Sequence, residues 1–136
     1  MAGISAWSMP GRGWSVAVAT VLAATTVIAP ARAASDVTCT YHLLSVWPGG
    51  FNADVSIANN GPMIDGWIVR WTFADATTVV QSWNSFLSER DSRTVVATNE
   101  AWNGVIPTGK VISFGWTALA ASTAVPTDIS VNDVAC

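Results

Sequence analysis

The sequence predicts an all-β protein, an antiparallel β-sandwich of the immunoglobulin-like or jelly-roll type, on three observations. After residue 34, apolar and polar side chains alternate in several short segments, which is the period of a strand with one buried face. Turn-forming residues such as Pro48-Gly49-Gly50 separate these segments. Many short strands within about 100 residues are typical of a sandwich.

The alternation is clearest in three segments, 51–57, 67–73 and 112–118, where every second residue is apolar. Each is expected to form a strand with one face on a core and one face in water. Further strands are expected at 38–46, 78–83, 92–98 and 128–134. Because there is neither an internal repeat nor a low-complexity linker, these strands are expected to form one domain.

The first 33 residues differ from the rest of the chain. Arg12 precedes a weakly apolar run from Trp14 to Ala29, and Ala31-x-Ala33 fits the small-x-small cleavage pattern. We therefore expect residues 1–33 to form a secretory signal peptide and residues 34–136 to form an extracellular domain. The alternative, a membrane anchor, is disfavoured because this short run is rich in alanine and threonine and has to span ~30 Å of hydrocarbon.

Charge excludes several classes of function. All nine acidic residues but only four of the six basic ones lie beyond residue 33, so the net charge changes from −3 to −5 on cleavage. An acidic domain is a poor nucleic-acid binder, since phosphate contacts need clustered Lys and Arg. We expect no nucleic-acid partner, and no membrane contact once the signal is removed.

The chain has two cysteines, Cys39 near the expected mature N-terminus and Cys136 at the last position. In an oxidising compartment the simplest expectation is one disulfide between them, worth roughly 4.7 kcal/mol for a loop of this length. Two free thiols or a bridge between two chains are the alternatives. Two cysteines and one histidine are too few for a typical zinc site, so no metal or other cofactor is expected.

The eight tryptophans fall into three groups. Two lie in the expected signal peptide, Trp7 and Trp14. Three share the apolar phase of their segments and are expected in the core, Trp67, Trp71 and Trp116. The other three have polar or turn-forming neighbours, Trp47, Trp83 and Trp102. Each of these could be a half-buried packing residue, but three exposed indoles without a ligand favour aggregation, so a ligand is expected.

A sugar polymer suits such a set of indoles. A pyranose ring has a flat C–H face that stacks on an indole, and each contact contributes on the order of 1 kcal/mol beyond its buried area. Rings on strands two apart would be separated by roughly 10 Å, about the disaccharide repeat of a β-1,4-linked chain. Three coplanar rings on a rigid sheet would hold a polysaccharide at little ordering cost.

The order of these motifs from Cys39 to Cys136 resembles family 2 carbohydrate-binding modules. The matching pieces are Cys39 followed by Tyr41, Trp47-x-x-Gly50-Phe51-x-Ala53-x-Val55-x-Ile57-x-Asn59, Ile64-x-Gly66-Trp67-x-Val69-x-Trp71-x-Phe73, Gln81-x-Trp83, Trp102-Asn103-Gly104-x-Ile106-Pro107-x-Gly109 and Phe114-Gly115-Trp116. The resemblance implies a β-sandwich with a disulfide joining its ends. It also implies non-catalytic binding of insoluble polysaccharide through a flat face of tryptophans.

Carried over by position, the resemblance assigns the three surface tryptophans to Trp47, Trp83 and Trp102, with Gln81 as a polar contact. The xylan-binding branch of the family tends to lose the tryptophan at position 83 and carries Arg at the position of Gly50. Because Trp83 and Gly50 are both present, the resemblance implies crystalline cellulose as ligand, with chitin as the second candidate.

Some polar positions depart from the family pattern. Cellulose-type members often have Asn where this chain has Ser45 and Asp54, and Gln or Asn where it has Ser113 and Thr117. We expect Asp54, Ser113 and Thr117 to contact sugar hydroxyls nevertheless, because their side chains accept or donate hydrogen bonds. Trp116, often Phe in the family, is expected to be a core substitution.

An enzyme is disfavoured. His42, the only histidine, has no motif of a catalytic triad around it. The carboxylate pairs Asp54 with Asp65, and Glu89 with Asp91, lack the signature of a glycosidase acid beside a base. We expect a free-standing binding module that acts beside separate glycoside hydrolases. The alternative is a secreted structural or interaction protein that uses the aromatic face on a protein or cell-wall partner.

Overall fold

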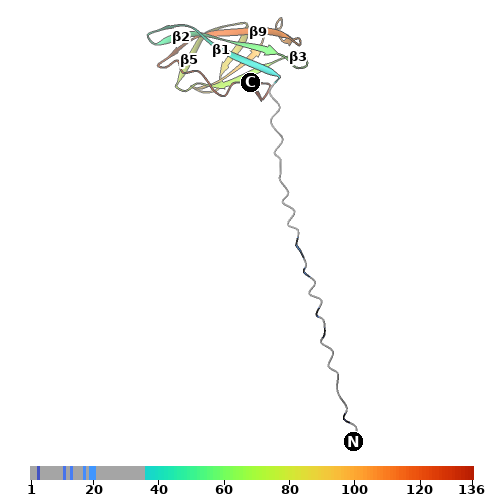
Figure 1. Cartoon of the computed structure of the whole chain (residues 1–136). Helices are drawn as coiled ribbons and strands as arrows, with labels where there is room; N and C mark the ends of the chain where they lie inside the picture. Colours follow the sequence, from blue (N-terminus) through green and yellow to red (C-terminus); the bar gives the residue numbers. More distant parts are fainter. Residues whose placement is uncertain (1–2, 4–10, 12, 14–16, 18, 21–35) are drawn as a thin grey trace. The chain divides into compact units, whose positions relative to one another are not determined.

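The computed structural model describes residues 3, 11, 13, 17, 19–20 and 36–136, and the fold is that of residues 36–136 (Figure 1). The predicted signal peptide and its cleavage point lie almost wholly outside the described residues. Within the described residues, the structure contains no helix with the length and apolar character needed to cross a membrane.

Two antiparallel sheets make up the domain (Figure 1). The first sheet has the order β1-β2-β9-β5, formed by Val37–Trp47, Gly50–Asn59, Lys110–Ala120 and Thr77–Trp83. The second has the order β11-β10-β4-β7-β6, formed by Val134–Ala135, Ser130–Val131, Ile68–Thr72, Thr94–Asn99 and Ser85–Glu89. A small ladder pairs β3 (Ile64–Asp65) with β8 (Val105–Ile106). The predicted all-β sandwich is confirmed.

The strands differ from the prediction in three places, the first being the short ladder of β3 and β8, neither of which is among the predicted strands. Strand β6 (Ser85–Glu89) is also absent from the predicted strands. Its apolar residues Phe86 and Leu87 are adjacent rather than alternating, so no period-2 signal marks it. The expected strand at 128–134 is a short hairpin, β10 and β11, because Asn132 and Asp133 adopt positive φ and turn the chain.

The core lies between the two sheets and contains the three tryptophans predicted to be buried, each no more than 1% exposed. Trp71 stacks on Trp116 with 4.7 Å between ring centroids, and Trp67 stacks on Phe114 at 5.2 Å. Offset aromatic stacking of this kind adds to the free energy gained from burial alone. The other fully buried apolar side chains are Phe51, Ala53, Val55, Ile57, Val69, Val95, Ala97, Ile106 and Ala118.

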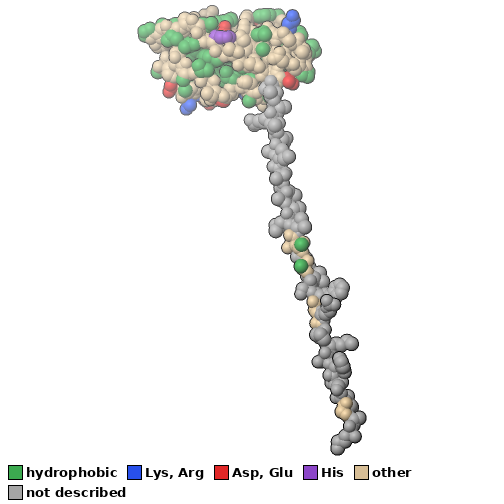
Figure 2. Space-filling model, viewed as in Figure 1, with side chains coloured by type: hydrophobic (Ala, Val, Ile, Leu, Met, Phe, Trp, Pro, Cys, Tyr) green, Lys and Arg blue, Asp and Glu red, His purple; other side chains and the backbone are tan. Residues whose placement is uncertain are grey.

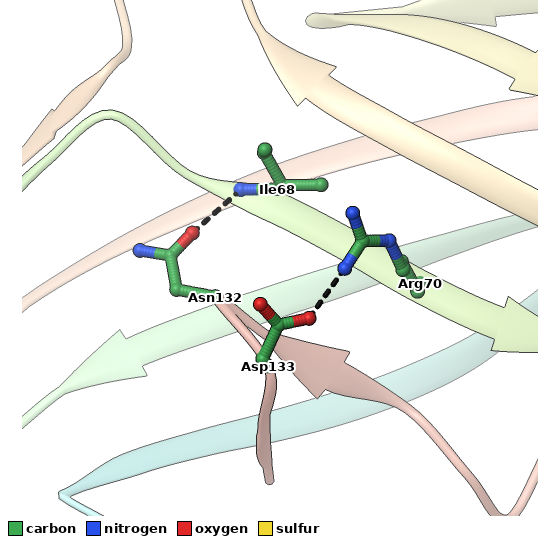
Figure 3. A network of polar contacts seen from close by, with 4 residues as sticks. All are labelled: Ile68, Arg70, Asn132 and Asp133. Carbon is green, nitrogen blue, oxygen red and sulfur yellow. Dashed lines mark hydrogen bonds and ion pairs between the residues drawn. The ribbon is translucent and has the colours of Figure 1, made fainter.

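A disulfide joins Cys39 at the start of β1 to Cys136, as predicted, so the alternatives of free thiols and an interchain bridge are wrong. Polar contacts add to it by holding the C-terminal hairpin on β4 (Figure 3). The amide of Ile68 donates to Oδ1 of Asn132 at 2.9 Å, and Arg70 forms an ion pair with Asp133. The disulfide therefore joins β1, an edge strand of the first sheet, to the C-terminal end of the hairpin at the edge of the second sheet.

Candidate functional site

The outer face of the first sheet is made of rows in which one outward residue comes from each strand. The Trp47 row contains Trp47, Gly50, Leu119 and Thr78. The Asn52 row contains Ser45, Asn52, Thr117 and Gln81. The Trp83 row contains His42, Asp54, Gly115 and Trp83. We call these three rows the outer face.

A β-bulge in each edge strand puts the tryptophans on this face. In β1, Tyr41 and Leu43 pair with the core residues Val55 and Ala53, so unbroken alternation would also turn Trp47 inward. The register shifts at Leu44, and Trp47 pairs with Gly50 on the outer face instead. An extra residue in one strand reverses the phase of every residue beyond it.

Strand β5 contains a bulge with the same effect. Val79 pairs with the core residue Ala118, and the register then shifts at Val80. Trp83 consequently pairs with Gly115 and points outward together with Gln81. The outward positions of Trp47 and Trp83 thus depend on two independent bulges, one in each edge strand of the sheet.

Both indoles rest on a glycine of an inner strand. A Cβ atom at residue 50 would lie 2.6 Å from Nε1 of Trp47, and a Cβ atom at residue 115 would lie 2.3 Å from Cζ2 of Trp83. Contacts this short are not tolerated, so any larger residue at either position has to displace the ring above it. The two glycines therefore leave the space in which the indoles lie close against the sheet.

The spacing of the rings differs from the expectation. Trp47 and Trp83 belong to the two edge strands, three strands apart, and lean inward over the neighbouring strands β2 and β9. Gly50 and Gly115 are separated by one strand step and four residues along the strand, which corresponds to about 14 Å. The glycines beneath the two rings are thus arranged diagonally along the sheet, whereas the expectation had rings across it at roughly 10 Å.

The third tryptophan, Trp102, is 71% exposed and lies in the turn between β7 and β8. The next residue, Asn103, donates from Nδ2 to the carbonyl of Asn84 at 2.7 Å. Asn84 directly follows Trp83 and is the single residue, at φ 61°, by which the chain passes from β5 to β6. Trp102 is therefore held next to the end of the Trp83 row that is farther from Trp47.

A hydrogen-bonded polar row separates Trp47 from Trp83. Thr117 donates from Oγ1 to Oδ1 of Asn52 at 2.7 Å, and Nδ2 of Asn52 donates to Oγ of Ser45 at 3.0 Å. Gln81 ends this row with an exposed side chain. Asn52 is not among the predicted site residues. Its polar position in the alternating segment 51–57 does, however, indicate that its side chain points away from the core.

The predicted residues Gln81, Asp54 and Thr117 belong to these rows, and Ser113 lies one row beyond Gly115 on the same side of β9. Nδ1 of His42 lies 2.6 Å from Oδ1 of Asp54. The backbone carbonyl of Ser113 accepts a hydrogen bond from Nδ2 of Asn84 at 3.2 Å. The fold thus brings the predicted residues together, while their contact with a sugar stays a prediction.

Glu89 and Asp91, the second carboxylate pair considered for catalysis, both accept hydrogen bonds from backbone amides. Asp91 accepts hydrogen bonds from the amides of Arg93 and Thr94, and these bonds lower the pKa of its carboxyl. Glu89 accepts one from the amide of Val79 at 2.5 Å. Among the described residues, no group of three His, Cys, Asp or Glu side chains could hold a metal ion.

The outer face carries two indoles that rest on glycines, with uncharged polar groups between them. A β-sandwich with such a face has the architecture of a carbohydrate-binding module. The chain belongs to the cellulose binding domain family, whose model matches residues 37–136. This match spans the whole sandwich, from the start of β1 to the terminal cysteine.

Comparisons with individual proteins agree with the family. The chain is 44% identical over 78 residues to Endoglucanase A of Thermobispora bispora, an alignment that covers 57% of this chain and 17% of that enzyme. The chitin-binding domain of Chi18aC from Streptomyces coelicolor has a TM-score of 0.63 and 27% identity, with 76% of this chain and 96% of that domain covered. The cellulose-binding family 2 domain from ScLPMO10C has a TM-score of 0.56 and 30% identity, with 76% and 100% covered.

Proposed function

We propose that this domain binds insoluble β-1,4-linked polysaccharide, crystalline cellulose foremost, without catalysing a reaction on it. Trp47, Trp83 and Trp102 stack on the sugar rings of a chain that runs along the diagonal of the outer face. The observation that carries the proposal is the pair of glycines, Gly50 and Gly115, beneath two of the indoles. Rings laid close against the sheet expose their opposite faces, which suits stacking on the flat face of sugar rings.

The polar groups between the rings supply the contacts at the sugar edges. Gln81 and Thr117 lie in the Asn52 row, between the two indoles, and Asp54 and Ser113 lie on the far side of that row. Hydroxyl groups around a pyranose ring both donate and accept, so this mixture of amide, hydroxyl and carboxylate groups can pair with them. Asn52 orients Thr117 and Ser45 through its two hydrogen bonds.

Chitin is the second candidate ligand, and the likeness to the chitin-binding domain of Chi18aC favours it. Chitin is also a flat β-1,4-linked polymer, so stacking alone does not separate it from cellulose. We further propose that residues 1–33 direct export and are removed, and that the exported domain acts on polysaccharide beside glycoside hydrolases. The 17% of Endoglucanase A that the alignment covers is consistent with a module of a larger enzyme system.

A depletion assay tests the function. The domain is mixed with microcrystalline cellulose, chitin or insoluble xylan, and the protein left in solution is measured. We expect cellulose to remove most of the protein and xylan to remove little. Retention of all protein in solution with every polymer would overturn the proposal in favour of a structural or interaction protein, and release of soluble sugar would contradict the absence of catalysis.

Three variants test the site, Trp47→Ala, Trp83→Ala and Trp102→Ala. Each is expected to weaken binding to cellulose at least tenfold, since each removes stacking worth over ~1 kcal/mol together with its buried area. Phe86→Ala is the matched control, because Phe86 is an exposed aromatic residue (63%) on the other sheet. Parental binding by all three tryptophan variants would show that the site lies elsewhere.

A further inference from the structure

The outer face contains one carboxylate, Asp54, in contact with the only histidine, among otherwise neutral side chains. Nδ1 of His42 lies 2.6 Å from Oδ1 of Asp54, in the row that ends with Trp83. In the three rows that form the face, Asp54 is the only acidic side chain and His42 the only basic one. More widely, the side of the molecule drawn in Figure 2 carries few charged side chains. A single carboxylate on such a surface has a large influence on which ligands approach it.

Asp54 lies beside the surface on which a ligand would rest. It pairs directly with Gly115 across β2 and β9, and Gly115 is the residue covered by the benzo ring of Trp83. Its side chain is 24% exposed and that of His42 is 48% exposed, so both reach solvent. Within residues 36–136, the second carboxylate oxygen of Asp54 and Nε2 of His42 make no hydrogen bond.

We propose that Asp54, held in place by His42, makes the binding face charge-selective, so that it takes neutral or cationic β-1,4-linked glycans and rejects those that carry carboxylates. The inference rests on the proposed function and adds to it a class of ligand that is excluded. The free oxygen of Asp54 accepts hydrogen bonds from hydroxyl or ammonium groups, but it repels a carboxylate on the sugar next to the one stacked on Trp83. His42 holds the other oxygen and limits the directions in which the carboxylate can turn.

Cellulose with altered surface charge provides the test. Three preparations of the same microcrystalline cellulose are compared in depletion assays at low ionic strength and near-neutral pH: unmodified, surface-oxidised to carry carboxylates, and grafted with quaternary ammonium groups. We expect binding to the oxidised surface to be about fivefold weaker than to the unmodified one, the factor for ~1 kcal/mol between two like charges ~4 Å apart in water. Added salt is expected to reduce the difference.

Variants separate the local effect from the overall negative charge. Asp54→Asn keeps the shape of the side chain and is expected to remove most of the fivefold difference. Asp133→Asn changes the net charge equally on the other sheet, where Asp133 pairs with Arg70, and is expected to keep the difference. Glu100→Gln removes the carboxylate two residues before Trp102 and is expected to keep the difference between unmodified and oxidised cellulose. His42→Gln leaves the Asp54 carboxylate in place and is also expected to keep it.

The outcomes distinguish this inference from the function on which it rests. If unmodified cellulose does not bind the domain, the proposed function fails. If unmodified cellulose binds it and the oxidised surface binds equally well, the charge selectivity is wrong. The role of Asp54 in this selectivity is also wrong if Asp133→Asn or Glu100→Gln relieves the rejection as fully as Asp54→Asn does.

Discussion

Asn103 joins the turn that carries Trp102 to the residue after Trp83, because its Nδ2 donates to the carbonyl of Asn84 at 2.7 Å. The same side chain accepts a hydrogen bond from the amide of Glu100 at 2.7 Å, which closes the turn around Trp102. Asn103 is only 6% exposed, and its own carbonyl accepts the indole N–H of the core residue Trp67 at 2.9 Å. One buried amide therefore sets the relative positions of two surface tryptophans.

Replacing Asn103 by Ala is expected to weaken cellulose binding and to destabilise the fold together. The carbonyl of Asn84 and the amide of Glu100 would each lose a partner, and a buried polar group left unpaired costs about 1–3 kcal/mol. Thermal unfolding and cellulose depletion measure the two effects. Asn103→Asp keeps the acceptor for Glu100 but turns a carboxylate oxygen toward the carbonyl of Asn84, so it is expected to destabilise the fold more than the loss of one hydrogen bond would. Unchanged binding by Asn103→Ala would contradict this role.

Gly115→Ala is expected to reduce binding to cellulose about as much as Trp83→Ala does. The added methyl would lie 2.3 Å from the indole of Trp83 and 2.7 Å from the backbone oxygen of Ala53, and the ring is the group that can move. Overpacking of this kind also lowers the free energy of unfolding by about 1–3 kcal/mol. Depletion assays on both variants and on the double variant give the comparison. If both changes act through the ring, the double variant binds no worse than Trp83→Ala.

Removal of the disulfide is expected to lower the free energy of unfolding by about 4 kcal/mol, because the bridge closes a loop of 97 residues. Denaturant unfolding of the double variant Cys39→Ser, Cys136→Ser measures this loss. The parent protein unfolded in reducing buffer is the control and is expected to match the variant. A loss below ~1 kcal/mol would mean that the contacts of β10 and β11 with β4 hold the C-terminus without the bridge.

Tyr41 is expected to make stability depend on pH in the alkaline range. Burial raises the pKa of its phenol from 10.0 to about 12, and its hydroxyl is buried without a hydrogen-bond partner among the described residues. Between pH 10 and pH 12 the unfolded chain releases this proton while the folded domain keeps it, so stability falls as pH rises through this window. Chemical unfolding at several pH values measures the slope.

Tyr41→Phe is the control for this effect. The substitution removes the titrating group and keeps the ring that packs edge-on against Trp116 at 5.7 Å. We expect the variant to be at least as stable as the parent near neutral pH, since the hydroxyl forms no bond that would be lost. The same alkaline slope in both proteins would assign the effect to another group.

The core could be predicted because side-chain direction in a strand repeats every two residues and can be read locally. Trp67, Trp71 and Trp116 share a phase with their apolar neighbours, and all three are buried. The pairing of Cys39 with Cys136 followed from two cysteines and an expected oxidising compartment. Strand β6 could not be predicted, because the adjacent apolar residues Phe86 and Leu87 show no alternation. Its strand conformation comes from pairing with β7.

The sequence by itself determined the fold class, the buried aromatic residues and the three tryptophans with polar neighbours. Only the tertiary structure decided how those three are presented. The bulges at Leu44 and Val80 turn Trp47 and Trp83 outward, and a bulge exists only relative to the partner strand it is paired with. Trp47 packs on Gly50, Trp83 packs on Gly115, and His42 contacts Asp54. Each of these contacts joins residues on different strands. Such contacts depend on register, and pairing between distant segments sets the register.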